Sequence, residues 1–441
     1  MLTPQEIQRI VEKALSFSTL PECSVTVSSS EQTYTRFANN AITMAGFSTR
    51  NSILIQSTRD SSTGEAQIGE ITDDALRAAV KRSEQLAALS PVNPEHCAAL
   101  GPQKFPATND YDEPTARAGS TEIIPQVRAV VETAAKRKLT AAGLFERDHT
   151  ITAIANKSGL YGLHRSADSG LTTTVRMPDG SSSGWAGHPS TRIGEIDGAQ
   201  IAETACRKCV QWKNARRLDP GAYTVVLEPT AAGDVVRLIQ GGFDARATEE
   251  GRTFLSRRGG GTIAGEKLFP DFIHLYTDPF DPRLPSAPWT ADHLPTRRIE
   301  WIQSGIVKNL ACNRYWSEKT HRPATPGLYP LYLGGGDASL EDLIRSVDRG
   351  LLVTHFWYIR FVNPKTLQHT GLTRDGLFLI EKGRIAEPVW NFRFNDSPVR
   401  LLQNARRLGR PVRVRGLEGG MMVAPPILAD DFRFTSVSEA I

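Results

Sequence analysis

The chain has 441 residues, of which 40% are hydrophobic and 23% charged, a composition typical of folded domains and unlike that of disordered or collagen-like chains. Lysine and arginine outnumber aspartate and glutamate by only 52 to 48, so the chain lacks the cationic excess that non-specific nucleic-acid binding requires. Nowhere is there an apolar run of about eighteen residues, so the sequence predicts no membrane-spanning helix.

The length exceeds that of one ordinary hydrophobic core, so we expect two domains. The first residues contain no basic stretch followed by an apolar one, and we expect no secretory signal. The five cysteines are dispersed and odd in number, which favours reduced thiols over a disulfide framework. These features together predict a cytoplasmic protein.

The first half of the chain predicts strands with flanking helices. A capping box at Thr3 opens an amphipathic helix. Residues 22–67 alternate in polarity, as expected for a small meander with turns at Asn39-Asn40 and at Gly46. The elements expected next are a helix over 73–89, a Pro-rich surface connection over 90–114, a helix over 122–136, strands at 160–164 and 171–176, and a helix over 199–216.

A strong breaker at residues 218–221 marks the expected domain boundary. The elements expected beyond it are a strand at 223–227, a helix over 230–240, hairpins at 298–308 and 377–385, and a helix over 340–349 that stops at Gly350. The predicted fold class is therefore α+β. We expect residues 1–219 to form an N-terminal domain of mainly antiparallel strands with flanking helices, and residues 220–441 to form a strand-rich C-terminal domain.

Local spacing reveals no complete active site. None of the nine histidines lies within two helical turns of another, whereas zinc needs several lone pairs that converge on one ion. A site assembled from distant histidines stays open. Cys206 and Cys209 have metal or redox spacing, but they lie inside a predicted helix and have no second pair, so we interpret them as helix-face cysteines.

Phosphate-binding and nucleophilic motifs are also incomplete. Residues 257–262 combine arginines with glycines but lack the terminal Gly-Lys-Ser/Thr of a phosphate-binding loop. Residues 334–337 are interpreted as a turn before a helix. No Gly-x-Ser-x-Gly elbow occurs, and local spacing pairs no serine or cysteine with a histidine.

Several short blocks follow one another in a characteristic order along the chain. They are residues 46–50, 74–80, 220–229, 294–298, 305–310, 338–344 and 376–385. Their joint order resembles the TldD/TldE (PmbA) metallopeptidase family over nearly the whole chain, from the N-terminal strands to Phe434-Thr435-Ser436.

The chain departs from this family at the metal motif. Zinc-binding members carry His-Glu-x-x-x-His after the middle strand and a cysteine near the C-terminus. Here the six positions read Arg237-Leu238-Ile239-Gln240-Gly241-Gly242, so Arg237 and Gly242 replace the two histidine ligands and Leu238 replaces the glutamate base. The region of the third ligand, residues 414–420, contains no cysteine, and the family's acidic Asp-Asp-Glu-Gly cluster is reduced to residues 290–293.

The resemblance implies a zinc-less, TldE-like subunit with no cofactor of its own, which helps to cleave extended peptides beside a TldD-like zinc-bearing partner. The alternative is a peptide-binding or scaffold homodimer without catalysis. A third hypothesis, of a different class, is enzyme chemistry outside the family pattern, built from scattered residues such as Asp292, His293 and Arg298.

Arg237 has two interpretations. It can be the solvent-facing side of a helix whose other face is apolar. Alternatively, its cation replaces the charge of the zinc ion and binds a peptide carboxylate through two hydrogen bonds. Asp292 and His293 are the other substrate-binding candidates.

Overall fold

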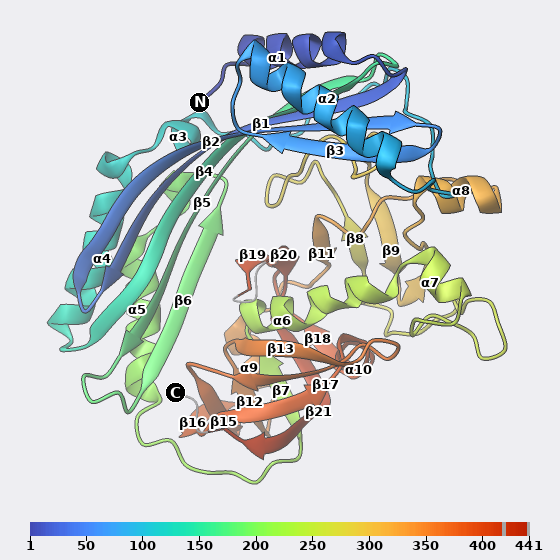
Figure 1. Ribbon diagram of the computed structural model, residues 1–441. Helices are drawn as coiled ribbons and strands as arrows, with labels where there is room; N and C mark the ends of the chain where they lie inside the picture. Colours follow the sequence, from blue (N-terminus) through green and yellow to red (C-terminus); the bar gives the residue numbers. More distant parts are fainter. Residues whose placement is uncertain (417–419, 439–441) are drawn as a thin grey trace.

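The computed structural model describes residues 1–416 and 420–438. In these residues the strands form three sheets, one within residues 22–190 and two within residues 222–437. Figure 1 shows the first sheet as a long, curved layer beside a more compact C-terminal region. The predicted α+β class is confirmed.

The N-terminal sheet is antiparallel, in the order β3-β2-β1-β4-β5-β6. Its strands are β1 (Glu22–Ala38), β2 (Ala41–Arg59), β3 (Ser62–Ile68), β4 (Thr140–Asn156), β5 (Tyr161–Arg176) and β6 (Ser183–Ser190). The expected turn at Asn39-Asn40 is confirmed, because both residues have positive φ, 51° and 59°. The turn expected at Gly46 is wrong. Gly46 lies inside β2 opposite Tyr34, because β1 and β2 pair along almost their whole lengths.

Helices pack on this sheet at two places. They are α1 (Pro4–Phe17), α2 (Asp73–Leu89), α3 (Glu113–Arg117), α4 (Ser120–Lys136) and α5 (Gly198–Gln211). Cys206 and Cys209 are buried in the core between α4, α5 and the sheet. The helix expected over 199–216 ends earlier, at Gln211, because Trp212 turns toward the C-terminal region and donates its indole N–H to the Val389 carbonyl at 2.9 Å.

The C-terminal region contains two sheets that share one core. The larger has the order β13-β14-β17-β21-β7-β12-β15-β16, with β18 paired to β21. Its strands are β7 (Ala222–Leu227), β12 (Arg349–Val353), β13 (Phe356–Asn363), β14 (Gln368–Thr373), β15 (Leu377–Glu381), β16 (Arg384–Val389), β17 (Phe392–Asp396), β18 (Ala405–Leu408) and β21 (Ile427–Val437).

The smaller C-terminal sheet has the order β10-β9-β8-β11-β20-β19. Its strands are β8 (Leu275–Thr277), β9 (Ile299–Gln303), β10 (Ile306–Val307), β11 (Leu331–Leu333), β19 (Val412–Arg415) and β20 (Met421–Ala424). The helices of this region are α6 (Pro229–Val236), α7 (Ala245–Glu249), α8 (Arg314–Thr320), α9 (Leu340–Arg345) and α10 (Pro398–Gln403). The 3₁₀ turn η2 (Arg237–Gly242) follows α6, and another 3₁₀ turn, η1 (Ile193–Glu195), lies between β6 and α5.

Two predicted helices of the C-terminal region are also too long. The helix expected over 230–240 is α6, which ends at Val236 and continues as the 3₁₀ turn η2. The helix expected over 340–349 is α9, which ends at Arg345, and Gly350 lies in β12 because that strand pairs with both β7 and β15. The two hairpin glycines, Gly305 and Gly383, both have φ of 73°, as the predicted turns require.

Candidate functional site

The candidate site begins where α6 ends. Pro229 starts this helix, and residues 231–236 are all buried, which holds the segment firmly in the core. The half-buried Arg237 and Leu238 follow on η2, and Gly242 at its end is buried. Arg237 therefore lies on a 3₁₀ turn, not on the solvent face of a continuing α-helix.

The buried end of η2 has no room for a ligand side chain. A Cβ atom on Gly242 would overlap ring atoms of Phe254, whereas a Cβ on the neighbouring Gly241 would meet Leu367 at an ordinary 3.5 Å. The space that a histidine needs at residue 242 is thus occupied by the Phe254 ring. The second ligand position is closed by packing as well as by its residue type.

The chain that follows β19 passes directly over α6 and η2. A Cβ on Gly416 would overlap the Asp234 carboxylate, and a Cβ on Gly420 would lie 3.2 Å from Nη1 of Arg237. Val414 also packs on α6, because its Cγ2 atom lies 2.7 Å from the position that a Cβ on Gly233 would take. The region of the third ligand therefore lies beside the motif segment; its residues 417–419 are outside the described residues.

The donor set does not fit zinc. In residues 1–416 and 420–438 no three His, Cys, Asp or Glu side chains gather in a way that could hold a metal ion. The buried Asp234, on the helix before the motif, accepts a hydrogen bond on its carboxylate from the Phe356 backbone N–H at 3.3 Å. A guanidinium at residue 237 supplies positive charge and N–H donors but no lone pair for a metal.

His369 is a buried neighbour of Arg237 that sequence spacing did not reveal. Its Nδ1 lies 2.7 Å from the Leu367 carbonyl, and its ring packs on Phe361 with 4.3 Å between centroids. Burial lowers the pKa of His369, and the charge of Arg237 lowers it further. The imidazole is therefore neutral near pH 7 and donates its Nδ1–H to that carbonyl.

A serine, an aspartate and a histidine meet where β6 touches the C-terminal region. The Ser183 hydroxyl donates to Asp375 Oδ1, and Nε2 of the fully buried His355 lies 3.4 Å from Asp375 Oδ2. Although burial raises the pKa of Asp375, the nearby His355 ring and the hydrogen bond from Ser183 hold it below its ordinary value. No hydrogen bond joins Ser183 to His355 in the described part of the chain. This arrangement is therefore a buried polar contact between β6 and the C-terminal region, and not a nucleophilic triad.

Two arginines on β19 connect the C-terminal region to the N-terminal sheet. Nη2 of Arg413 lies 2.8 Å from both carboxylate oxygens of Asp168 on β5, and Arg415 pairs with Glu146 on β4. Burial nevertheless raises the pKa of Asp168 to about 6, against the charges of Arg413 and Arg415. Removal of one partner from such a partly buried ion pair is destabilising, because the remaining charge is left with neither a counter-charge nor full hydration.

Asp292 and His293 lie in a second, polar location. They line a cavity of about 580 Å³ between the start of β1, the segment around residues 93–100, and the start of α8. Asp292 accepts a hydrogen bond from the Arg314 backbone N–H at 3.2 Å, and burial lowers the pKa of His293. Asp292 and His293 thus share one cavity, whereas Arg237 lies near His369 and Gly420 and does not line this cavity.

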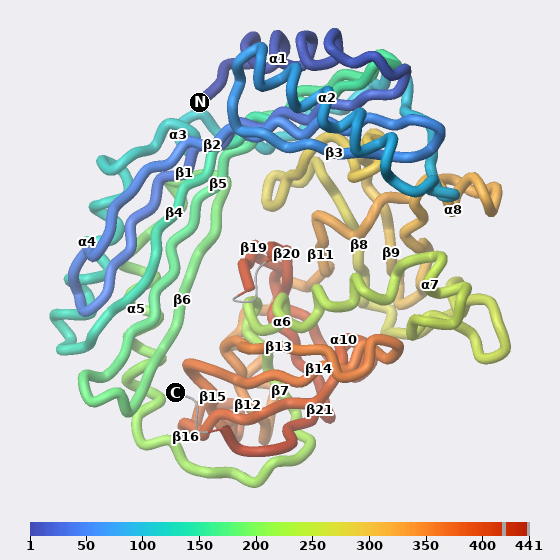
Figure 2. The backbone as a smooth tube through the Cα atoms, viewed as in Figure 1, coloured from blue at the N-terminus to red at the C-terminus, as the bar shows by residue number. Residues whose placement is uncertain are grey.

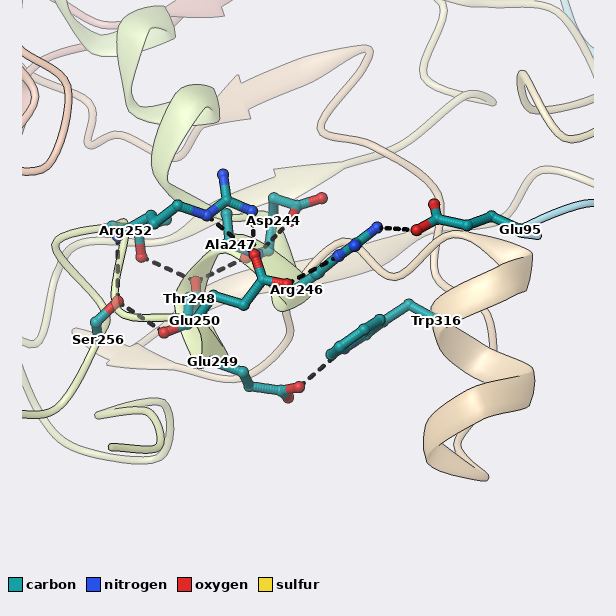
Figure 3. Close-up of polar contacts among 11 residues, drawn as sticks. Glu95, Asp244, Arg246, Ala247, Thr248, Glu249, Glu250, Arg252, Ser256 and Trp316 are labelled. Atoms are coloured by element: carbon teal, nitrogen blue, oxygen red, sulfur yellow. Dashed lines mark hydrogen bonds and ion pairs between the residues drawn. The ribbon is translucent and has the colours of Figure 1, made fainter. Parts of the chain in front are cut away.

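Glu95, which lines this cavity, makes a further contact between the two regions. Arg246 on α7 pairs with Glu95 at 2.7 Å and with Glu250 at 3.0 Å, while Trp316 donates its indole N–H to Glu249 at 2.8 Å (Figure 3). Arg298, the third residue of the non-family hypothesis, instead pairs with Asp278 and Glu300. The structure does not assemble Asp292, His293 and Arg298 into one site.

The comparisons with known proteins agree with this architecture. Residues 220–436 match the family described as the PmbA/TldA metallopeptidase C-terminal domain. TldE from Thermococcus kodakarensis has the same fold, with 19% identity, a TM-score of 0.85, and coverage of 98% of this chain and 100% of that one. No curated protein matches the sequence significantly.

Two further solved structures, both of proteins proposed to be modulators of DNA gyrase, share the fold. The Thermotoga maritima protein is 16% identical, with a TM-score of 0.85, and the match covers 97% of this chain and 100% of that one. The Bacteroides thetaiotaomicron protein is 17% identical, with a TM-score of 0.85, and the match covers 99% and 100%.

These matches define a fold shared with TldE along nearly the whole chain, and the C-terminal match places that fold in a metallopeptidase family. The chain belongs to the TldD/TldE (PmbA) family, as the order of its sequence blocks predicted. Among the helices of the described residues, none is both long and apolar enough to cross a membrane.

Asp168→Asn should change how stability depends on pH. The folded carboxyl keeps its proton up to about pH 6, whereas the unfolded one titrates near its ordinary 3.8. Between these values the folded state binds more protons, so Asp168 makes the free energy of unfolding fall with rising pH, by at most about 1.4 kcal/mol per pH unit. Urea unfolding from about pH 4 to 7 should therefore show wild type losing stability relative to Asp168→Asn.

The exposed Asp179 provides the control. Its hydrogen bonds with Ser181 lower its pKa, so Asp179→Asn should not reproduce the trend. A constant stability difference between wild type and Asp168→Asn across this pH range would contradict the assignment.

Gly242→Ala should destabilise the protein although it adds only one methyl group. The new Cβ must displace the Phe254 ring, and overpacking of this kind costs about 1–3 kcal/mol. Gly241→Ala is the matched control, because its Cβ makes an ordinary contact. Urea unfolding of the two variants compares them directly; equal stability would show that residue 242 has room for a ligand after all.

Proposed function

We propose that this chain is the non-zinc-binding, TldE-like subunit of a TldD/TldE-type metallopeptidase complex. It acts in the proteolysis of extended peptides, in peptide maturation or small-protein turnover, and a zinc-bearing TldD-like partner supplies the metal. The observation that carries the proposal is the motif segment 237–242, which lacks both histidines and the glutamate and is closed by Phe254 at its buried end.

The contribution of this subunit is to bind and orient the peptide. Extended peptides are held by main-chain hydrogen bonds along a strand edge, while pockets select side chains. Three features support such a role: the strand-rich C-terminal region, the polar cavity at Asp292 and His293, and the cationic Arg237 at the start of the motif segment. We also propose a cytoplasmic location, because all five cysteines are free thiols.

The decisive experiment is reconstitution with the partner. The native chain should co-purify with a protein that contains His-Glu-x-x-x-His, and peptidase activity should require both chains. Elemental analysis should find about one zinc per complex, held by the partner. The control is a partner variant with its motif glutamate changed to glutamine, which should assemble but not cleave. Peptide hydrolysis or stoichiometric zinc in this chain alone would overturn the proposal, and absence of any partner would favour the scaffold homodimer.

Within the reconstituted complex, Arg237→Ala tests whether the guanidinium binds a substrate carboxylate. Loss of a bidentate charge-assisted contact should raise KM by about tenfold or more while the complex still assembles. Arg237→Lys should recover only part of the affinity, because an ammonium does not match a carboxylate bidentately. Substrate processing that is the same in wild type and Arg237→Ala would reduce Arg237 to a structural residue.

A further inference from the structure

The C-terminal region contains a second cavity, apart from the candidate site described above. Its volume is about 530 Å³, which lies in the roughly 300–1,000 Å³ range of small-molecule sites. It shares no lining residue with the polar cavity at Asp292 and His293. Its walls come from the segment after α7, the β13–β14 turn, the end of β17, α10 and β21. Figure 2 shows α10 and β14 on the side of the C-terminal region away from β6.

Part of the lining of this cavity is apolar. The apolar side chains are Phe254, Ile263, Leu268 and Val399. All four pack against the main core of the C-terminal region, yet each keeps part of its surface exposed. Removal of such apolar surface from water is favourable and does not depend on direction. This part of the lining therefore favours a ligand with a hydrocarbon body.

The polar groups next to Phe254 already have hydrogen-bond partners within the protein. The Thr253 backbone N–H donates to Ser256 Oγ at 3.1 Å, and the Ser256 hydroxyl donates to the Thr248 carbonyl at 2.7 Å. The hydroxyls of Thr248 and Thr253 lie 2.9 Å apart. This part of the lining thus suits a hydrocarbon better than a ligand body rich in donors and acceptors.

The charged groups of the lining are mainly cationic. They are the cations Lys365, Arg400 and Arg433 and one carboxylate, that of Asp396. The Asp396 side chain is only 1% exposed, and it accepts hydrogen bonds from Arg400 Nε and from the Arg433 backbone N–H, both at 3.0 Å. Because Arg400 balances this carboxylate, the surplus charge of the lining is positive. The lining therefore favours an anionic ligand.

Lys365 supplies a cation without a carboxylate partner. Its side chain is exposed, and no ion pair joins it to an acidic residue in residues 1–416 and 420–438. Its position is defined by the turn, because Pro364 precedes it and its backbone N–H donates to Asn363 Oδ1 at 3.0 Å. Lys365 is therefore available to a negatively charged group in the cavity.

We propose that this cavity binds a hydrocarbon carboxylate, such as the anion of a medium-chain fatty acid. The hydrocarbon contacts the four apolar side chains, and Lys365 pairs with the carboxylate. Both parts of the ligand are needed to match the lining. A neutral hydrocarbon gains nothing from the cations, a small polar anion gains nothing from the apolar side chains, and a cationic amphiphile is repelled.

This cavity shares a wall with the motif segment. The Phe254 ring lines the cavity and also fills the space beside Gly242. Leu367, in the β13–β14 turn, lies 3.2 Å from the position that a Cβ on Gly242 would take. The proposed ligand therefore contacts the ring that closes the buried end of η2, but it uses none of residues 237–242.

The test is isothermal titration calorimetry of the purified chain with octanoate, and with octanamide and octylammonium as probes of the same chain length. Octanoate should bind in a saturable 1:1 manner with a Kd below about 1 mM. Octanamide should bind at least about threefold more weakly because it lacks the charge, and octylammonium more weakly still.

Two variants locate the binding within the cavity. Lys365→Gln should raise the Kd of octanoate about three- to fivefold, the effect of one exposed ion pair. Val399→Asp should raise it about tenfold or more, because it removes hydrocarbon contact and adds a repelling carboxylate. Val399 lies in the first turn of α10, where an acidic residue suits the helix. Lys81→Gln, at an exposed position on α2, is the matched control and should leave the Kd unchanged.

Hydrogen exchange maps the site without mutation. Octanoate should slow exchange at residues 253–268 and 398–403, and slowing at residues 93–100 of the polar cavity instead would overturn the proposal.

Four results of the calorimetry would also overturn it. They are no saturable binding of octanoate, equal affinities for octanoate and octanamide, the same Kd in Lys365→Gln and Lys81→Gln, and tighter binding of N-acetylphenylalanine, which would indicate a site for a peptide C-terminus. Because neither a partner nor zinc is present, failure of the proposed peptidase role would not alter the outcome.

Discussion

The arginines of β19 hold the two regions of the molecule in their relative position. Alternation along this short strand directs Arg413 and Arg415 to carboxylates of the N-terminal sheet and directs Val414 to the opposite side, against α6. One strand thus couples the sheet to the segment that carries the degenerate motif. Because the Arg413 and Asp168 side chains are only 9% and 21% exposed, loss of the arginine would leave a half-buried carboxylate without its counter-charge.

The same close packing explains why this chain departs from the metal-binding pattern so completely. The Phe254 ring fills the space beside Gly242, a Cβ on Gly416 would overlap the Asp234 carboxylate, and a Cβ on Gly420 would lie 3.2 Å from Nη1 of Arg237. A metal site needs donors with room to converge on one ion. Here the Phe254 ring occupies the space that a ligand at residue 242 would need, and the residue at position 237 is a cation.

In this molecule, the buried polar groups that join the two regions are different from the polar groups that line a cavity. The buried groups Asp375, His355 and Ser183 join the two regions, whereas Asp292 and His293 line a polar cavity. In a family defined by peptidase chemistry, such a division suits a subunit whose role is to bind and assemble.

The sequence alone determined the family, the α+β class and most element positions, because periodicity, capping boxes and hairpin glycines are local signals read within a few residues. It also revealed the missing ligands, since a lost histidine is visible without coordinates. Tertiary structure alone decided the rest. Gly46 lies in a strand and Gly350 in another because neighbouring strands pair through them, against the local preference of glycine for turns. The Arg413–Asp168 pair, the fit of Phe254 to Gly242, and the separation of Arg237 from Asp292 join residues distant in the chain, and no local pattern encodes such contacts.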